Sequence, residues 1–256
     1  MAGAGIMGAM GLLALSAPLL APADPFALVG AALDPPSLHH LMGTDILGRD
    51  LLSGVLYGAR TSLVVAGITG ALAFIIGTGT GLVAGYAGGW TDDVLMRLAE
   101  IVQVLPRFFF AVLAVALFGP GLDRIILALA ITSWPGLARV VRAEVLALRT
   151  QDFVRAAEAA GASHTRIVMR ELLPGVLSPA FVMIGLLLGQ VLLLEASLGF
   201  LGLGDPNLAS WGALISQGQP FLLVAWWLPL FPGLAITLTV LGMNLLVDAF
   251  SGSVPT

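Results

Sequence analysis

Long apolar runs separated by shorter polar stretches make up most of the chain. A helix needs about 20 apolar residues to cross a bilayer, and the runs lack the alternation that is typical of an outer-membrane barrel. We therefore predict an all-α, polytopic membrane helix bundle with about six transmembrane helices. The predicted spans are residues 1–23, 62–85, 98–118, 125–141, 176–194 and one within 221–250.

Two polar segments interrupt this pattern on the predicted outer side. Residues 24–50 carry three prolines and four aspartates and are predicted to form a loop on the outer side. Residues 206–219 are polar and broken by glycine, and we expect an outer or partly re-entrant segment, because backbone at membrane depth must be covered by protein or water. Residues 1–60 thus form a first span with an outer loop, and residues 61–250 form the core domain.

The first run has the length of a signal peptide. It lacks the basic residues that begin a secretory signal, so we favour a retained first span. Six spans then place both termini on the same side of the membrane.

Composition supports a membrane protein. Hydrophobic residues make up 58% of the chain and charged residues only 10%, and the mean hydropathy is +1.01, values that exclude an ordinary soluble domain. The 32 glycines suit close helix packing in lipid. In the second predicted span these are Gly67, Gly70, Gly77, Gly79, Gly81 and Gly85.

The positive charge is concentrated in one stretch. Six of the eleven basic residues lie between Arg139 and Pro174. A charge run alone is usually a solvated face, but short arginine-rich loops between spans stay on the cytoplasmic side. This stretch therefore predicts that residues 152–174, and both termini, are cytoplasmic.

Residue types that are absent narrow the chemistry. The chain has no cysteine, which excludes disulfides and thiolate sites, and no lysine, which excludes an intact Walker A loop. An ATP-driven process would need a motor in another subunit. His39 and His40 are better explained as a solvated loop than as a metal site, because adjacent histidine side chains point apart in most backbones. We predict no catalytic residue and no metal site.

Residues 152–174 form a polar segment with the pattern of a helix, a turn and a second helix. Alanines dominate the stretch from Phe153 to Ala160, and Gly161 can end a helix in the left-handed conformation. Ser163 can cap the helix that follows, and Pro174 either ends that helix or begins the next span. A short helix with an alanine face suits docking by another protein.

The same segment resembles the EAA loop of ABC importer permeases, in spacing and at five positions. The matching residues are Ala156, Ala157, Gly161, Leu173 and Pro174, while Arg155 stands in place of the usual Glu and Glu171 in place of Ile. Further stretches at 40–50, 56–63, 85–97, 195–204 and 226–248 are similar to the dipeptide, oligopeptide and nickel branch of these permeases.

This resemblance implies a type I ABC importer permease (MetI-like) fold and a second, or "C" type, permease of the bacterial inner membrane. It implies a transport subunit rather than an enzyme, which carries peptides or nickel chelates and binds no cofactor itself. The implied partners are a homologous permease, two cytoplasmic ATPases that use ATP and magnesium, an extracytoplasmic binding protein and the bilayer, but no nucleic acid. The implied coupling residues are Arg155, Ala156, Ala157, Ala160, Gly161, Leu173 and Pro174.

Two ionisable residues inside or at the end of spans are candidates for the pathway or its gate, since such residues are costly in lipid. For Arg107 we favour a structural role, snorkelling or pairing with Glu100 two turns earlier. Glu195 lies near the outer end of the fifth predicted span. We leave three roles open for it: a solvated side chain, a part in gating, and a structural hydrogen bond.

Two other classes of transporter are weighed against the importer. An ion-coupled secondary transporter needs carboxylates or histidines near the bilayer midplane, whereas Glu100, Glu195 and Asp248 fall near span ends and the sequence has no visible inverted repeat. A passive channel would need no ATPase. Which cargo is carried, among dipeptide, oligopeptide, glutathione-like compound and nickel chelate, stays open at this point.

Overall fold

The computed structural model describes residues 2–251, and this part of the chain is helical with no β-strand beyond two isolated bridges. Within these residues five helices are long and apolar enough to cross a membrane, and a bent pair counted as one span makes a sixth. The predicted all-α bundle is confirmed. The α-helices are α1 (Ala2–Leu20), α2 (Leu51–Ala87), α3 (Gly89–Val104), α4 (Arg107–Phe118), α5 (Leu122–Leu148), α6 (Asp152–Ala159), α7 (His164–Arg166), α8 (Leu173–Phe200), α9 (Trp211–Gly218) and α10 (Trp227–Ser251).

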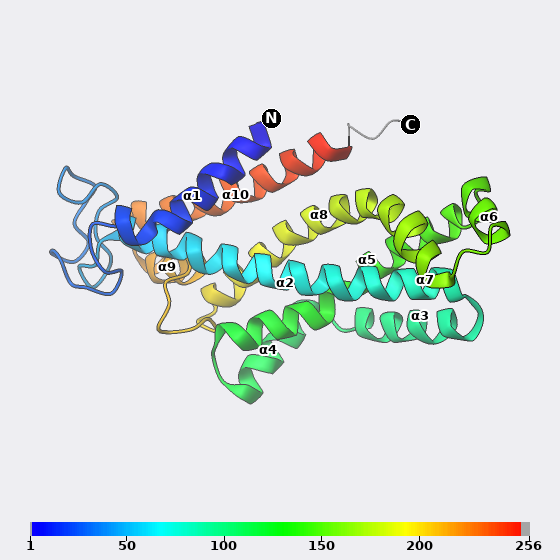
Figure 1. Cartoon of the computed structure of the whole chain (residues 1–256). Coiled ribbons are helices and arrows are strands. Elements are labelled where there is room, and N and C mark those ends of the chain that lie inside the picture. The colour runs from blue at the N-terminus through cyan, green and yellow to red at the C-terminus, as the bar shows by residue number, and fades with distance from the viewer. Residues whose placement is uncertain (1, 252–256) are drawn as a thin grey trace.

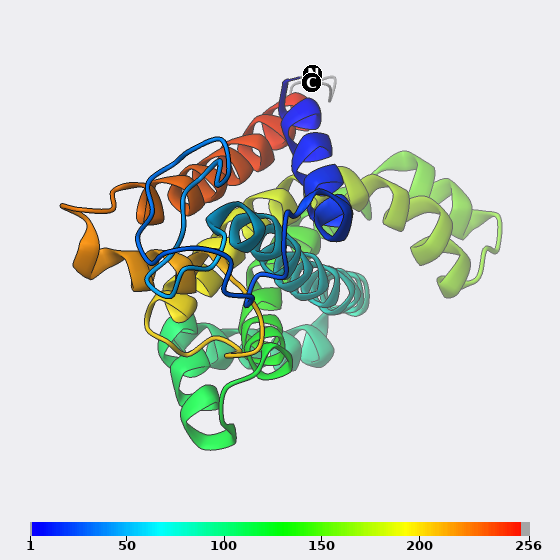
Figure 2. The same cartoon turned by 90° about the vertical axis from the view of Figure 1, so that its left-hand side faces the viewer.

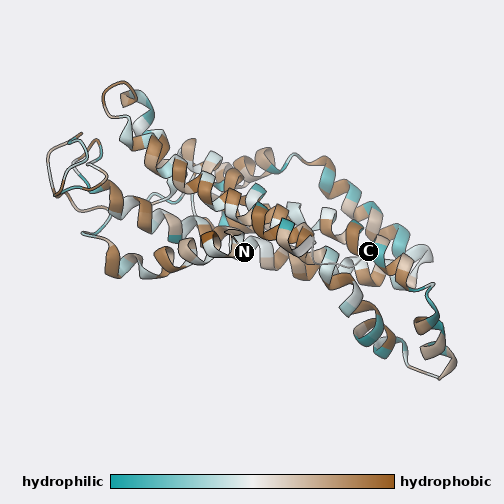
Figure 3. Cartoon of the chain, turned by 90° about the horizontal axis from the view of Figure 1, so that it is seen from above, coloured by the Kyte–Doolittle hydropathy of each residue, from teal (hydrophilic) through white to brown (hydrophobic). Residues whose placement is uncertain are grey.

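The long helices run side by side along one axis (Figure 1). One end, here called the loop end, holds residues 21–50 and α9, and the opposite end, here called the α6 end, holds α6 and α7. Figure 2 looks onto the loop end, with α1 and α10 on one side of α2 and α4 on the other. Apolar residues extend along the long helices, and polar ones gather toward the ends and connections (Figure 3).

The longest helix, α2, begins well before its predicted span. Asp50 caps it by accepting hydrogen bonds from the backbone N–H and the hydroxyl of Ser53, at 2.8 and 2.7 Å. At about 1.5 Å per residue its 37 residues extend roughly 55 Å, more than the thickness of a bilayer core. The predicted domain boundary at residue 60 lies inside this helix.

Glycines allow α2 to pack tightly against α5. A Cβ atom at Gly77 would lie 2.9 Å from Leu137 Cβ, and one at Gly81 would lie 2.6 Å from the carbonyl oxygen of Ala138. Gly85 meets Val145 in the same way. The predicted close packing is confirmed at these three positions, whereas Gly67 and Gly79 face open space.

The third predicted span is wrong as a single helix. In its place α3 and α4 meet at 76° across Leu105 and Pro106. Proline has no N–H for the helical ladder and its ring clashes with the preceding turn, which explains the break. Pro135, by contrast, lies buried within the continuous helix α5.

The loop of residues 21–50 is folded rather than loosely solvated. The Thr44 hydroxyl donates to the carbonyl of Ala31 at 2.6 Å. His40 lies 3.4 Å from Asp50, with only 17% of its side chain exposed, so the expectation that this histidine is solvated is wrong. Trp211 of α9 is fully buried and donates to the carbonyl of Val55 at 2.9 Å, which fixes α9 against α2.

Candidate functional site

The short helix α6 has one buried side and one exposed side. Val154 is fully buried, and Ala157 packs against the same hydrophobic cluster. Arg155, Ala156 and Ala160 are exposed. Of the predicted coupling positions on and just after α6, Ala157 therefore faces the interior of the protein, and Arg155, Ala156 and Ala160 face outward.

The predicted turn after α6 is confirmed. Gly161 adopts φ of +78°, in the left-handed region that favours glycine, and its N–H donates to the carbonyl of Glu158 at 2.9 Å. The Ser163 hydroxyl accepts from the backbone N–H of Arg166 at 3.4 Å and so caps α7. The glycine at position 161 and the serine at position 163 therefore predicted the turn and the cap correctly from the sequence.

A π-helix, which the sequence analysis missed, joins α7 to α8. It spans Ile167–Leu172, and both of its terminal residues are buried. Leu173 and Pro174 then form the first turn of α8, which decides between the two predicted places for this proline. Because Pro174 has no N–H to offer the carbonyl of Arg170, regular α-helical bonding cannot continue through this point.

Residues 152–174 are fixed to three long helices. Val154, Ile167 and Leu172 share a buried cluster with residues of α2, α5 and α8, namely Leu82, Leu137, Val141, Val145, Val176 and Ala180. The Tyr86 hydroxyl, at the end of α2, lies 2.7 Å from Nδ1 of His164. A displacement of this segment must therefore be transmitted to the long helices.

The outward surface of the α6 end exposes large apolar side chains between charged ones. Phe153 is 45% exposed and Met169 is 54% exposed. Arg155, Arg166 and Arg170 are also exposed. Exposed apolar groups rimmed by charges are typical of a protein-docking surface.

An ion pair joins α3 to α5 near the α6 end. Arg142 forms two hydrogen bonds of 2.5 Å with the carboxylate of Asp92. Arg149 donates to the carbonyl of Gly85 at 3.1 Å. Both arginines are therefore held by contacts to a neighbouring helix, and no local pattern in the sequence indicates which partner each one takes.

Arg107 does not pair with Glu100, so the pairing alternative for this residue is wrong. The bend between α3 and α4 removes the two residues from a common helix face, and Glu100 lies 3.4 Å from Arg97 instead. Arg107 donates to the side-chain oxygen of Gln190 at 3.1 Å. The side chain of Arg139 donates to Gln103 beside the same bend.

Glu195 is buried, with 2% exposure, which excludes solvation among the three roles left open for it. The Ser62 hydroxyl donates to its carboxylate at 2.8 Å, and the Ser210 hydroxyl also bonds to it. Because these serines lie on α2 and at the start of α9, Glu195 connects three elements of the bundle.

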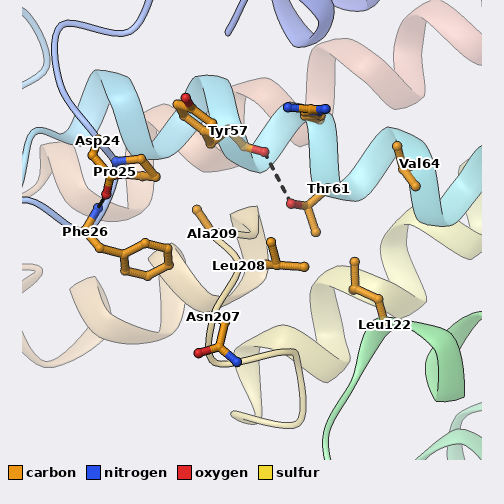
Figure 4. Close-up of a pocket in the computed structure, with 11 residues that line it drawn as sticks. Asp24, Pro25, Phe26, Tyr57, Thr61, Val64, Leu122, Asn207, Leu208 and Ala209 are labelled. Atoms are coloured by element: carbon orange, nitrogen blue, oxygen red, sulfur yellow. Dashed lines mark hydrogen bonds between the residues drawn. The ribbon is translucent and has the colours of Figure 1, made fainter. Parts of the chain in front are cut away.

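A cavity of about 550 Å³ opens at the loop end. Figure 4 shows Tyr57, Thr61 and Val64 of α2 on one side and residues 207–209 on the other. Exposed Arg60 also lines this cavity. Its walls come from the folded loop, α2, the start of α5 and the segment before α9.

Comparison with known proteins gives one consistent result. The family described as "Binding-protein-dependent transport system inner membrane component" matches residues 77–254. The dipeptide transport system permease protein DppC of Alkalihalophilus pseudofirmus is 40% identical over 242 residues, covering 93% of this chain and 79% of that protein. The glutathione transport system permease protein GsiD of Pectobacterium atrosepticum is 38% identical over 214 residues, covering 83% of this chain and 71% of that protein.

Solved structures share the fold. The inward-facing methionine ABC transporter MetNI matches with a TM-score of 0.63 at 20% identity, covering 78% of this chain and 97% of that chain. An amino acid ABC transporter crystallised with histidines matches with a TM-score of 0.60 at 16% identity, covering 78% of this chain and 94% of that chain. The predicted MetI-like fold is confirmed.

Proposed function

This chain belongs to the family of binding-protein-dependent transport system inner membrane components, the permease subunits of ABC importers, and from this membership we propose its function. It is a multi-pass inner-membrane transport subunit and not an enzyme. Membership implies ATPase and substrate-binding partners in general. The cargo, the pairing of subunits and the roles of single residues are proposals.

The proposed cargo is a short peptide. Relatives at about 40% identity over most of the chain are named for dipeptide transport, and another is named for glutathione, which is itself a tripeptide. We propose that this chain pairs with a second, homologous permease, two cytoplasmic ATPases and an extracytoplasmic binding protein. In this arrangement the chain binds no cofactor, and ATP and magnesium are used by the ATPases.

The observation that carries the coupling role is the two-sided packing of residues 152–174. Outward-facing Phe153, Ala156 and Ala160 offer a surface for an ATPase, with Arg155 at its edge. Inward-facing Val154 fixes the same segment to α2, α5 and α8. Closure of the ATPases would then rotate these helices as a body and alternate access to the path. Gly161, Leu173 and Pro174 set the shape of the segment.

Orientation follows from the charge distribution. The α6 end carries the arginine-rich stretch, which favours the cytoplasmic side, and α10 runs from the loop end back toward the α6 end (Figure 1). A Cβ at Gly3, at the start of α1, would meet the backbone of Leu246 near the end of α10. Both termini are therefore proposed to be cytoplasmic.

The test is an Ala160→Trp variant in the complete transporter, with Ala160→Ser as the matched control. Bulk at an exposed contact should prevent close packing of the ATPase, so co-purification of the ATPase and ATP-driven peptide uptake should both fall at least about tenfold. The serine variant should retain both. Ala157 is unsuitable because tryptophan there would disrupt the buried cluster.

Normal retention of the ATPase by Ala160→Trp would contradict the docking assignment. Absence of uptake of any dipeptide or tripeptide by the wild-type transporter would instead contradict the proposed cargo. The two results are independent, since retention of the ATPase requires no substrate.

A further inference from the structure

Four polar side chains gather where α3 bends into α4. They are Gln103, Arg107, Arg139 and Gln190, here called the bend cluster, and they come from four different helices. Arg107 donates to Gln190 at 3.1 Å, and Arg139 donates to Gln103. The cluster therefore consists of two guanidinium–amide pairs.

The Arg107–Gln190 pair lies near the middle of the bundle's length. Two residues before Gln190, the side chain of Leu188 contacts the position that a Cβ of Gly70 would occupy. Gly70 lies nineteen residues from the first residue of α2 and seventeen from the last. At about 1.5 Å per residue, the pair is level with a point roughly 29 Å from the first residue of this helix and roughly 26 Å from the last. That depth corresponds to the hydrocarbon core of a bilayer.

The second pair lies closer to the α6 end. Arg139 follows Ala138, whose carbonyl lies against Gly81, eleven residues further along α2 than Gly70. The bend cluster thus extends from the middle of the bundle toward the proposed cytoplasmic side. It is arranged along the direction in which a cargo would cross.

The bend cluster is not sealed inside this chain. Gln103, Arg139 and Gln190 are exposed, and Arg107 is only partly buried. Elsewhere on α4 the exposed side chains are apolar, including Phe109 and Leu113. Charged groups at this depth face the interior of a bundle or a water-filled cavity and avoid lipid. The exposed face of the cluster must therefore be covered by protein or water.

The charge of both arginines is left without a carboxylate within residues 2–251, because each bonds to a neutral amide. A guanidinium group presents a planar fork of donors that matches a carboxylate in two parallel hydrogen bonds. A peptide with a free C-terminus carries such a carboxylate. Exchange of the Gln190 amide for this group would give Arg107 a stronger, charge-assisted partner.

We propose that the bend cluster faces the translocation path between the two permeases, and that Arg107 binds the C-terminal carboxylate of the peptide during its passage. This inference rests on the proposed function for the identity of the cargo. Arg139, nearer the α6 end, offers the carboxylate its next partner.

The first test uses cysteine labelling, for which the chain is well suited because it has no native cysteine. Gln103→Cys and Leu113→Cys are compared in the complete transporter, using a charged methanethiosulfonate reagent that reacts with the thiolate in water. Leu113 is the matched control, since it is 53% exposed on α4 but belongs to the apolar surface. We expect labelling at least about tenfold faster at position 103. Equal rates at both positions would overturn the assignment to the path.

The second test is Arg107→Gln, which keeps an amide-bonding side chain next to Gln190 but removes the charge. At saturating binding protein, the maximal rate of dipeptide uptake should fall about tenfold, while the KM for the loaded binding protein and retention of the ATPase stay unchanged. Arg107→Lys, which keeps the charge without the fork, should recover part of the rate. Uptake at the wild-type rate in Arg107→Gln would overturn the carboxylate role.

The two tests separate the inference from the proposed function. If the wild-type transporter takes up no peptide, the cargo proposal and the carboxylate role fail together, but cysteine labelling still decides whether the cluster faces the path. If the Arg107→Gln chain does not insert, the Gln103→Cys comparison decides alone, since it leaves Arg107 in place.

Discussion

At the scale of single residues, glycine positions on α2 give a prediction with a matched control. In Gly81→Ala the new Cβ would lie 2.6 Å from the carbonyl oxygen of Ala138 and 2.7 Å from Val141 Cβ, neither of which is a flexible side-chain end. The helices must separate, and we expect the free energy of unfolding in detergent to fall by about 1–3 kcal/mol. Gly79→Ala adds a Cβ into open space on the same helix and should change the free energy of unfolding by less than about 0.5 kcal/mol. Equal losses of stability in the two variants, measured by thermal denaturation, would contradict this account.

The buried carboxylate of Glu195 gives a second prediction at this scale. Ser62→Ala removes a donor to a carboxylate that is shielded from water, and an unsatisfied buried group costs about 1–3 kcal/mol. Ser197→Ala is the control, because its exposed hydroxyl bonds to the carbonyl of Leu193 in its own helix. The melting temperature in detergent should fall clearly for Ser62→Ala and little for Ser197→Ala. If the control falls as far, the hydroxyl–carboxylate contact does not stabilise the bundle.

The sequence predicted the roles of residues that act through the local backbone conformation, but not the roles that depend on packing between distant helices. Gly161, Ser163 and Pro174 act through the turn, cap or first helical turn in which they sit, and the structure places them there. Glu195 takes its partner from a helix 133 positions earlier. No local pattern specifies which faces of α2 and α8 meet, so the burial of Glu195 could not be derived from the sequence.

At the scale of helices, hydropathy predicted how many spans exist but not where they bend. Pro106 and Pro135 both interrupt apolar runs, yet only the first ends a helix. Pro135 is buried in α5, while Pro106 is exposed immediately before α4. The outcome depends on packing that holds the neighbouring turns together, which is a tertiary effect. The broken span also explains why the pairing of Arg107 with Glu100 was wrong.

The contact between α2 and α7 predicts a variant that still binds the ATPase but couples ATP hydrolysis to transport less efficiently. Tyr86→Phe removes the hydroxyl that lies 2.7 Å from His164, a bond worth about 1 kcal/mol. The ATPase should still co-purify, because its proposed surface on α6 is untouched, but peptide uptake per ATP hydrolysed should fall several-fold. A double-mutant cycle with His164→Ala is the control, and the two changes together should cost no more than the larger one alone. Additive losses would mean that the two residues act independently.

At the scale of the whole molecule, α2, α5 and α8 connect the α6 end to the loop end without interruption between their termini. The bundle and the helical segment of residues 152–174 were evident in the sequence, because long apolar runs indicate spans and the alanines, Gly161 and Ser163 indicate a helix, a turn and a second helix. The full length of α2 was not evident, because its first eleven residues carry Arg60 and several polar groups and so fall outside the apolar window. Their helical state depends on the Asp50 cap and on packing against α9 through Trp211.

Placement of the two ends on opposite sides of the membrane is the last prediction, and it bears on every proposal that depends on direction. Leu38, at the loop end, is 95% exposed, and Ser163, at the α6 end, is also exposed. In intact cells a membrane-impermeant maleimide should label Leu38→Cys, whereas Ser163→Cys should react only after the membrane is permeabilised, because the arginine-rich segment stays with the cytoplasm. The wild-type chain, which has no cysteine, is the blank. Labelling of Ser163→Cys in intact cells would place the docking surface away from any cytoplasmic ATPase and would reverse the proposed direction of transport through the bend cluster.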